Sequence, residues 1–143
     1  MARVDHGKTS PDGMQHLYEL HKYSSVTVDK KLLDIVYLRV SQINGCSYCV
    51  DLHWADALKG GEDMRKINSV VTWKKTPFFS DKERAALLLA EKLTDLHERE
   101  LSDEVYDKVK PHFTDKEIVD LVLAIANMNA MNRMAIAFKK MPV

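Results

Sequence analysis

The sequence predicts an all-α protein, a single-domain bundle of about seven helices. Three observations lead to this prediction: apolar residues recur at helical spacing, capping signals precede these segments, and no convincing β-strand is present. With 143 residues, of which 45% are hydrophobic, the chain is long enough for one core. Because no internal repeat or linker divides it, we expect one domain over residues 1–143.

Start signals define the first two expected helices. Ser10 offers an N-cap before a proline at the first helical position, which predicts a helix over 11–22. Residues 24–28 are too few to build a sheet and are predicted to be a connector. Asp29 can cap a second helix over 29–43. Its apolar stripe consists of Leu32, Leu33, Val36, Tyr37 and Val40.

The middle of the chain is expected to hold two helices and a loop. A helix over 46–60 follows a break at Asn44 and ends at two consecutive glycines, and another is expected over 62–71. Residues 73–79 are predicted to be a loop, because Pro77 is incompatible with a helix interior.

Two capping boxes, in which Ser or Thr is followed three residues later by Glu, open helices expected over 80–96 and 114–138. A shorter helix is expected over 102–112. The last helix is apolar on most faces, which favours the centre of the bundle or a subunit interface. We interpret its polar residues as hydrogen-bonding between helices or subunits, with lining of an active-site pocket as the alternative. These residues are Asn127, Asn129, Asn132 and Arg133.

Charge and hydropathy argue against several partners. Lys and Arg total 21 and Asp and Glu total 21, and no basic stripe is present, so we expect neither nucleic acid nor an anionic membrane surface as partner. The longest apolar run, 121–126, is too short to span a bilayer, and no secretory signal is visible, so we expect a cytoplasmic protein. No nucleotide, flavin or haem motif is found, and we expect no cofactor.

The two cysteines, Cys46 and Cys49, form a single C-x-x-C motif. In a short intracellular chain this pattern indicates redox or metal chemistry. On a helix that begins near Cys46, both cysteines and His53 lie on one stripe, each within reach of the next. The first turn of a helix stabilises a thiolate, and His53 can accept the thiol proton.

Two other interpretations of the pair stay open at this point. The cysteines can be small buried apolar residues without chemistry. They can also bind zinc together with His53, but a structural zinc site needs a fourth ligand and the chain has no third cysteine, so we expect no metal. From helix position alone, Cys46 is expected to be the more exposed thiol.

The segment 38–53, LRVSQINGCSYCVDLH, resembles the signature of the alkylhydroperoxidase D branch of the carboxymuconolactone decarboxylase family. Segments 73–87 and 130–138 are similar as well, and the resemblance covers the chain from about Asp5 to Pro142. It implies an all-helical fold, assembly as a homotrimer or hexamer, and a peroxide-reducing dithiol. We interpret the aromatic residues of the predicted loop as contacts with a neighbouring subunit, or as a lid over the dithiol. They are Trp73, Phe78 and Phe79.

The resemblance also implies roles for individual residues. Cys49 would attack the peroxide and become a sulfenic acid, Cys46 would condense with it, and a dithiol reductant such as a lipoyl-bearing protein would reduce the disulfide. A proton relay would connect Cys49 to His53 and to Asp34 on the preceding helix. The chain departs from the family at two positions: Asp34 stands where Glu is usual, and Tyr48 where the best-known peroxidases have His.

We therefore predict a thiol-dependent peroxidase that reduces organic hydroperoxides through a cycle of Cys46 and Cys49. One alternative is a lyase of the carboxymuconolactone decarboxylase type, which has the same fold but does not depend on the cysteine pair. The other is a redox sensor or stress protein that switches between dithiol and disulfide without turnover.

Overall fold

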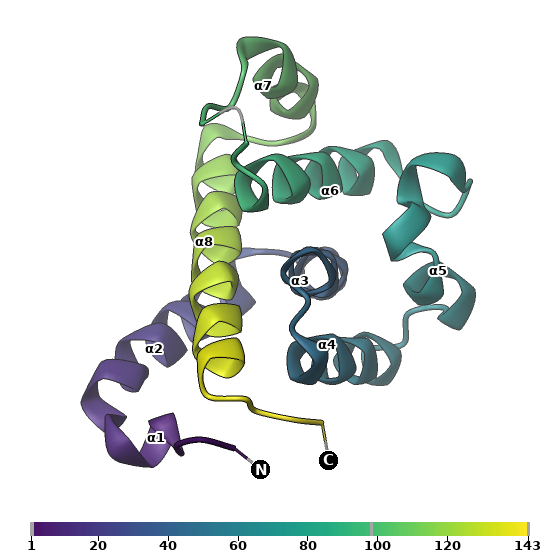
Figure 1. Cartoon of the computed structure of the whole chain (residues 1–143). Helices are drawn as coiled ribbons and strands as arrows, with labels where there is room; N and C mark the ends of the chain where they lie inside the picture. The colour runs from purple at the N-terminus through teal and green to yellow at the C-terminus, as the bar shows by residue number, and fades with distance from the viewer. Residues whose placement is uncertain (1, 98, 143) are drawn as a thin grey trace.

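The computed structural model describes residues 2–97 and 99–142. Within these residues the chain forms eight α-helices, two short 3₁₀ helices and no β-strand, which confirms the all-α prediction (Figure 1). The helices are α1 (His6–Thr9), α2 (Pro11–Thr27), α3 (Lys30–Asn44), α4 (Ser47–Lys59), α5 (Met64–Asn68), η1 (Val70–Lys75), α6 (Asp81–Thr94), α7 (Asp103–Val109), η2 (Lys110–His112) and α8 (Asp115–Ala137).

Helix α3 lies at the centre of the bundle. It packs against α4, α6 and α8, and Figure 1 shows these helices arranged around it. Nine of its 15 residues are buried, including one carboxylate, Asp34. Helix α8 packs against α2, α3 and α6, but it keeps an exposed apolar stripe that includes Val119 and Leu123. The helix at the core is therefore the one that leads directly into the C-x-x-C motif.

The capping predictions are confirmed. The Ser80 hydroxyl accepts the Glu83 N–H at 3.2 Å, and the Ser80 N–H donates to the Glu83 carboxylate at 2.8 Å. Thr114 and Glu117 form the same reciprocal pair at the start of α8. Among the described residues, no helix is both long and apolar enough to cross a membrane.

Two boundaries differ from the prediction. The expected connector 24–28 is helical through Thr27, because the Ser24 and Thr27 hydroxyls donate to carbonyls one turn earlier, both at 3.0 Å, and so satisfy the helix backbone. The expected helix 62–71 is divided into α5 and η1, and η1 extends into the predicted loop. Helix α1 was not predicted; the Asp5 side chain caps it by accepting the Lys8 N–H.

The aromatic residues of η1 and of the segment after it pack into the chain's own core. Trp73 and Phe79 are only 6% and 5% exposed, and Phe78 packs against the same core. The Trp73 indole donates to Glu91 at 2.8 Å, and Arg84 donates to the carbonyls of Trp73 and Phe79. The interpretation as subunit contacts or a lid over the dithiol is therefore wrong for Trp73 and Phe79, whereas for the half-buried Phe78 a subunit contact stays a prediction.

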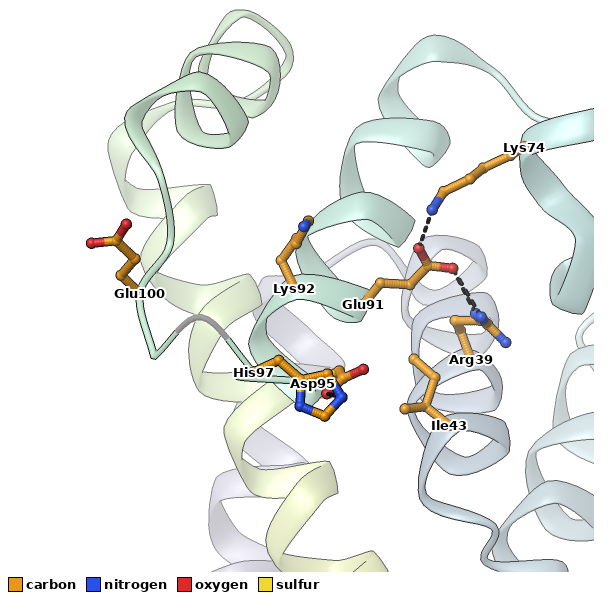
Figure 2. Close-up of a pocket in the computed structure, with 8 residues that line it drawn as sticks. All are labelled: Arg39, Ile43, Lys74, Glu91, Lys92, Asp95, His97 and Glu100. Atoms are coloured by element: carbon orange, nitrogen blue, oxygen red, sulfur yellow. Dashed lines mark hydrogen bonds and ion pairs between the residues drawn. The ribbon is translucent and has the colours of Figure 1, made fainter.

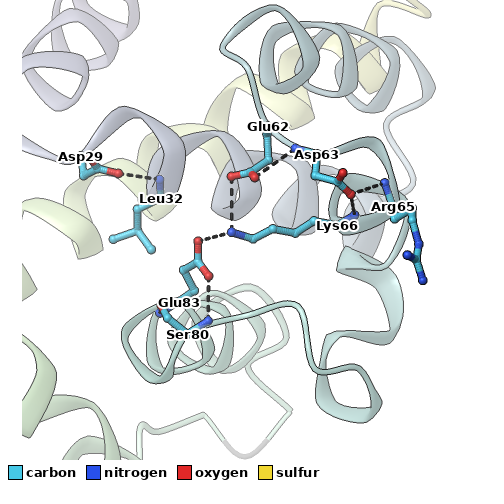
Figure 3. Close-up of polar contacts among 8 residues, drawn as sticks. All are labelled: Asp29, Leu32, Glu62, Asp63, Arg65, Lys66, Ser80 and Glu83. Carbon is cyan, nitrogen blue, oxygen red and sulfur yellow. Dashed lines mark hydrogen bonds and ion pairs between the residues drawn. The ribbon is translucent and has the colours of Figure 1, made fainter.

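A lysine with a largely buried side chain connects α5 to α6. Lys66 on α5 lies 2.5 Å from Glu83 on α6 and 3.4 Å from Glu62, as Figure 3 shows. Its side chain is only 15% exposed, so the two carboxylates offset the cost of burying the ammonium group. This contact holds α5 against α6 and fixes the segment that follows α4.

Candidate active site

The turn between α3 and α4 positions the cysteine pair. Gly45 adopts a left-handed conformation, with φ of 67°, and ends α3. Cys46 is the N-cap of α4, and its Sγ accepts the backbone N–H of Cys49 at 3.3 Å. The two cysteines form a disulfide with their Cα atoms 5.3 Å apart. The motif therefore lies at the positive end of a helix, where an anionic sulfur is stabilised.

Cys46 is not the more exposed of the two residues. It is 2% exposed and Cys49 is 5% exposed, and Cys46 packs against Ala135 of α8 with Tyr48 beside it. The expectation drawn from helix position is thus wrong, because α8 covers the start of α4. Cys49, in contrast, lines a cavity.

The cavity beside Cys49 has a volume of about 250 Å³. It lies between α1, α2, α4, the C-terminal half of α8 and the residues after it. Its lining is mostly apolar, and its charged or titratable groups include three imidazoles, one carboxylate and one ammonium group. The residues that matter most below are His21, Cys49, His53, Asp56, Met128 and Met131.

His53, which the sequence predicts to be the proton acceptor, lies one turn after Cys49 on α4. Its ring is 5% exposed, and Nδ1 lies 3.9 Å from Oδ2 of Asp56. Burial, with help from the neighbouring His21 and Lys30, lowers the pKa of His53 to about 4. His53 is therefore neutral near pH 7 and able to accept a proton.

Three residues of the site were not predicted: His21, Tyr37 and Asp56. The Tyr37 ring contacts both imidazoles, with centroid distances of 5.3 Å to His21 and 5.2 Å to His53. Burial raises the pKa of Tyr37 to about 12, so its hydroxyl stays protonated. Asp56 follows His53 by three residues, and on a helix this spacing is sufficient to predict that the two side chains lie close together. His21 and Tyr37 come from other helices, and only the fold brings them here.

Asp34 lies apart from the cavity. Its carboxylate is 9% exposed and lies 2.7 Å from Nζ of Lys30, one turn earlier on α3. It also packs against the end of α4, where a Cβ on Gly60 would lie 3.2 Å from Oδ2. Burial raises the pKa of Asp34 although Lys30 opposes this. Among the described residues no hydrogen bond joins Asp34 to Cys49 or His53.

The polar residues of α8 hydrogen-bond to neighbouring helices. Asn132 is fully buried and donates to the Ser41 hydroxyl at 3.1 Å. It also accepts from Asn44 at 3.0 Å, and Asn44 donates to Asn129 at the same distance. The interpretation that these residues bond between helices is confirmed for Asn127, Asn129 and Asn132, whereas Arg133 donates to Asn129 of its own helix. Asn129 and Asn132 support the turn that carries Cys46.

A larger pocket lies elsewhere and holds no cysteine. It has a volume of about 490 Å³ and is lined by Arg39, Lys74 and Glu91, among others (Figure 2). Glu91 pairs with Arg39 at 2.9 Å and with Lys74 at 2.6 Å. Burial acts to raise the pKa of Glu91, but hydrogen bonds from Lys74, Trp73 and Arg39 lower it below its usual value. Glu91 is thus a structural anion, and we place the active site at Cys49.

Within residues 2–97 and 99–142, no group of three or more His, Cys, Asp or Glu side chains is arranged to hold a metal ion. The sulfurs of Cys46 and Cys49 bond to each other. The site thus combines a disulfide-bonded cysteine pair with a neutral imidazole one turn further along α4.

The fold and the site define a small all-α protein with a disulfide-bonded cysteine pair at a helix N-terminus. The sequence model of the carboxymuconolactone decarboxylase family matches residues 11–92, and the chain belongs to this family. The uncharacterized protein YdfG of Bacillus subtilis (strain 168) is 36% identical over 136 residues, which cover 94% of this chain and 92% of YdfG.

Solved structures agree with this assignment. The chain superposes on Atu0492 of Agrobacterium tumefaciens with a TM-score of 0.95 and 30% identity, covering 100% of this chain and 99% of that one. Atu0492 is a protein of unknown function that has been suggested to be the antioxidant defence protein AhpD. The debrominase Bmp8 shares the fold, with a TM-score of 0.85, 20% identity and coverage of 95% and 74%. The chain is an alkylhydroperoxidase D-like member of its family.

Proposed function

We propose that the protein is a thiol-dependent peroxidase that reduces organic hydroperoxides through a cycle of Cys46 and Cys49. One observation carries the proposal: Cys49 is bonded to Cys46 and lines a largely apolar cavity that it shares with a neutral His53. A nucleophilic sulfur, a resolving sulfur and a proton acceptor are the groups that such a reaction needs.

The reaction begins with the reduced pair. His53 accepts the proton of the Cys49 thiol, and the thiolate attacks the terminal oxygen of the hydroperoxide. The S–O bond forms, the O–O bond breaks, and the alkoxide takes a proton to leave as an alcohol. The Cys46 thiol then attacks the sulfenic acid of Cys49, so that the S–S bond forms and water leaves.

An external dithiol must return the pair to its reduced form by thiol–disulfide exchange. We propose a dithiol reductant such as a lipoyl-bearing protein. Since Cys49 lines the cavity and Cys46 is covered by Ala135, Cys49 is the sulfur that a reductant entering the cavity reaches.

We also propose assembly as a homotrimer or hexamer. The support is the exposed apolar stripe on α8, where Val119 is 58% and Leu123 is 36% exposed. A groove beside this stripe is lined by Leu93, Leu96 and Val122, among others. Apolar surface of this kind is typical of a protein interface.

Two alternatives differ from this proposal in measurable ways. A lyase of the carboxymuconolactone decarboxylase type does not need the cysteine pair, and nothing in the geometry of the site favours it. A redox sensor would use the same disulfide but would be oxidised once without turnover. The suggested identity of Atu0492 is consistent with the peroxidase proposal.

The test is peroxide consumption by the wild type with cumene hydroperoxide and dihydrolipoamide, beside Cys46→Ser, Cys49→Ser and the control Ser47→Ala. We expect many turnovers for the wild type and the control. Cys46→Ser should react once and retain a sulfenic acid that dimedone traps, and Cys49→Ser should not react. A single turnover in the wild type would indicate a sensor, and full activity in Cys49→Ser would contradict the proposal.

A further inference from the structure

We propose that His21 is a further catalytic residue, whose imidazole donates a hydrogen bond to the departing oxygen of the hydroperoxide. This inference rests on the proposed peroxidase function. It assigns a role to a residue that lies 28 positions before Cys49 in the sequence.

His21 lies on α2, whereas Cys49 and His53 both lie on α4.

The placement of His21 is the first support. It lines the same cavity as Cys49 and His53, and its ring stacks on Tyr37 with an interplanar angle of 24°. Figure 1 shows α2 and α4 on opposite sides of the C-terminal half of α8. His6, His21 and His53, the three imidazoles of the cavity, are therefore supplied by three different helices.

The second support is an unsatisfied polar atom. Nδ1 of His21 is buried and has no hydrogen-bond partner among the described residues, and the same is true of the Tyr37 hydroxyl. Buried polar atoms without partners are rare in folded proteins, and each one calls for an explanation such as a catalytic role or a bound water. Among the described residues no hydrogen bond holds the His21 ring, so its N–H is available to a substrate oxygen in the cavity, and because Nδ1 is buried this N–H is the one on Nε2.

The third support is the geometry of the reaction. The thiolate attacks one peroxide oxygen in line with the O–O bond, so the departing oxygen lies on the far side of the attacked oxygen from Sγ of Cys49. His53 is one turn from Cys49 on the same helix and lies beside the sulfur. A donor for the departing oxygen is better placed on another helix, and His21 meets this condition.

The electrostatic surroundings agree with a neutral donor. Burial lowers the pKa of His21, although the negative charge of Asp56 opposes this, so the imidazole is neutral at pH 7 and carries one N–H. While the S–O bond forms and the O–O bond breaks, this N–H stabilises the charge on the alkoxide oxygen. The alkoxide finally receives the proton that His53 took from the thiol, so His21 ends the step unchanged.

The test compares two oxidants that differ in their leaving group. The alkoxide released from tert-butyl hydroperoxide is a poor leaving group, whereas the carboxylate released from peracetic acid is a good one. His21→Leu should slow single-turnover oxidation by tert-butyl hydroperoxide by about 10²-fold, the usual effect of removing one donor to a developing oxyanion. Oxidation by peracetic acid and alkylation of Cys49 by iodoacetamide should stay close to the wild-type rates.

Two further variants complete the experiment. His21→Gln keeps a side-chain N–H and should recover much of the lost rate with tert-butyl hydroperoxide. His16→Leu, on an 82% exposed side chain of the same helix, should behave as the wild type. An equal loss of rate with both oxidants, or no loss with either, would overturn the role of His21. A wild type that neither peroxide oxidises would instead overturn the proposed function itself.

Discussion

The side-chain amide of Asn44 donates to Oδ1 of Asn132 at 3.0 Å, which ties the last residue of α3 to α8 two residues before Cys46. Asn132 in turn donates to the hydroxyl of Ser41 at 3.1 Å. Because this network joins α3 to α8, the turn that presents the cysteine pair cannot move without breaking these bonds.

The first prediction concerns this network. Asn132→Ala should lower the free energy of unfolding by about 1–3 kcal/mol, because the buried Ser41 hydroxyl and the Asn44 amide lose a partner. Urea unfolding followed by circular dichroism measures the change. Arg133→Ala, at the next and exposed position, serves as the control and should have little effect. Equal stability of the two variants would mean that the network does not hold the turn.

The second prediction concerns Phe79, which the structure places in the core. Phe79→Ala should lower the free energy of unfolding by about 3–5 kcal/mol, the usual effect of removing a buried aromatic ring. Val71→Ala, at a 54% exposed position, is the matched control. If Phe79→Ala changed the oligomeric state without loss of stability, the residue would be a subunit contact after all.

The third prediction is a pH dependence set by His53. Its pKa is about 4 in the folded protein and 6.5 in the unfolded chain, so the unfolded state binds more protons between these values. The stability that the neutral His53 contributes to the folded protein is fully present above pH 6.5 and is lost as the pH falls toward 4. At about 1.4 kcal/mol per pKa unit, the shift corresponds to roughly 3 kcal/mol of stability.

Urea unfolding at a series of pH values between 4 and 7 measures this dependence. His53→Gln should show a shallower decrease in stability toward acid than the wild type, while the exposed-site variant His16→Gln should follow the wild type. Parallel curves for wild type and His53→Gln would show that His53 titrates normally in the folded protein.

The fourth prediction concerns assembly. We expect the wild type to scatter light as a multiple of its 16.4 kDa chain mass, with three or six copies favoured by the family resemblance. Leu123→Glu places a charge in the exposed apolar stripe of α8 and should release smaller species. Met64→Glu, at a 51% exposed apolar position on α5, should leave the assembly intact. A wild-type particle of one chain mass at micromolar concentration would contradict the prediction.

Local signals predicted most of the fold. The capping boxes at Ser80 and Thr114 act within three residues, so the sequence alone reveals them. The end of α2 was missed because Ser24 and Thr27 satisfy the helix backbone with their own hydroxyls. Trp73 was wrongly predicted to contact a neighbouring subunit or to cover the dithiol, because its burial depends on contacts distant in sequence, above all the hydrogen bond to Glu91.

The candidate site likewise contains residues that local spacing predicts and residues that only the fold brings together. Cys46, Cys49 and His53 lie within two turns of one helix, and their spacing alone placed them together. His21 and Tyr37 join them only through the packing of α2 and α3, which no local pattern reports. The relative burial of the two sulfurs also depends on α8, which is distant in sequence.

The last prediction concerns Asp34, whose role in a proton relay stays a proposal. Burial raises the pKa of this carboxyl despite the neighbouring Lys30, so its ionised form costs stability. The sign follows from proton binding: between the ordinary pKa of 3.8 and the raised value the folded state binds more protons, and stability falls as the pH rises through this window.

Asp34→Asn keeps the shape of the side chain but removes the base. It should therefore slow peroxide reduction by about 10²-fold, the lower end of the range for general-base assistance, without lowering stability at pH 7. Asp34→Glu restores the length that is usual in the family and should react at least as fast as the wild type. Single-turnover oxidation by cumene hydroperoxide and urea unfolding, both at pH 7, measure the two effects in the three proteins. Equal oxidation rates in all three would show that Asp34 only pairs with Lys30, and His53 would then be the sole proton acceptor.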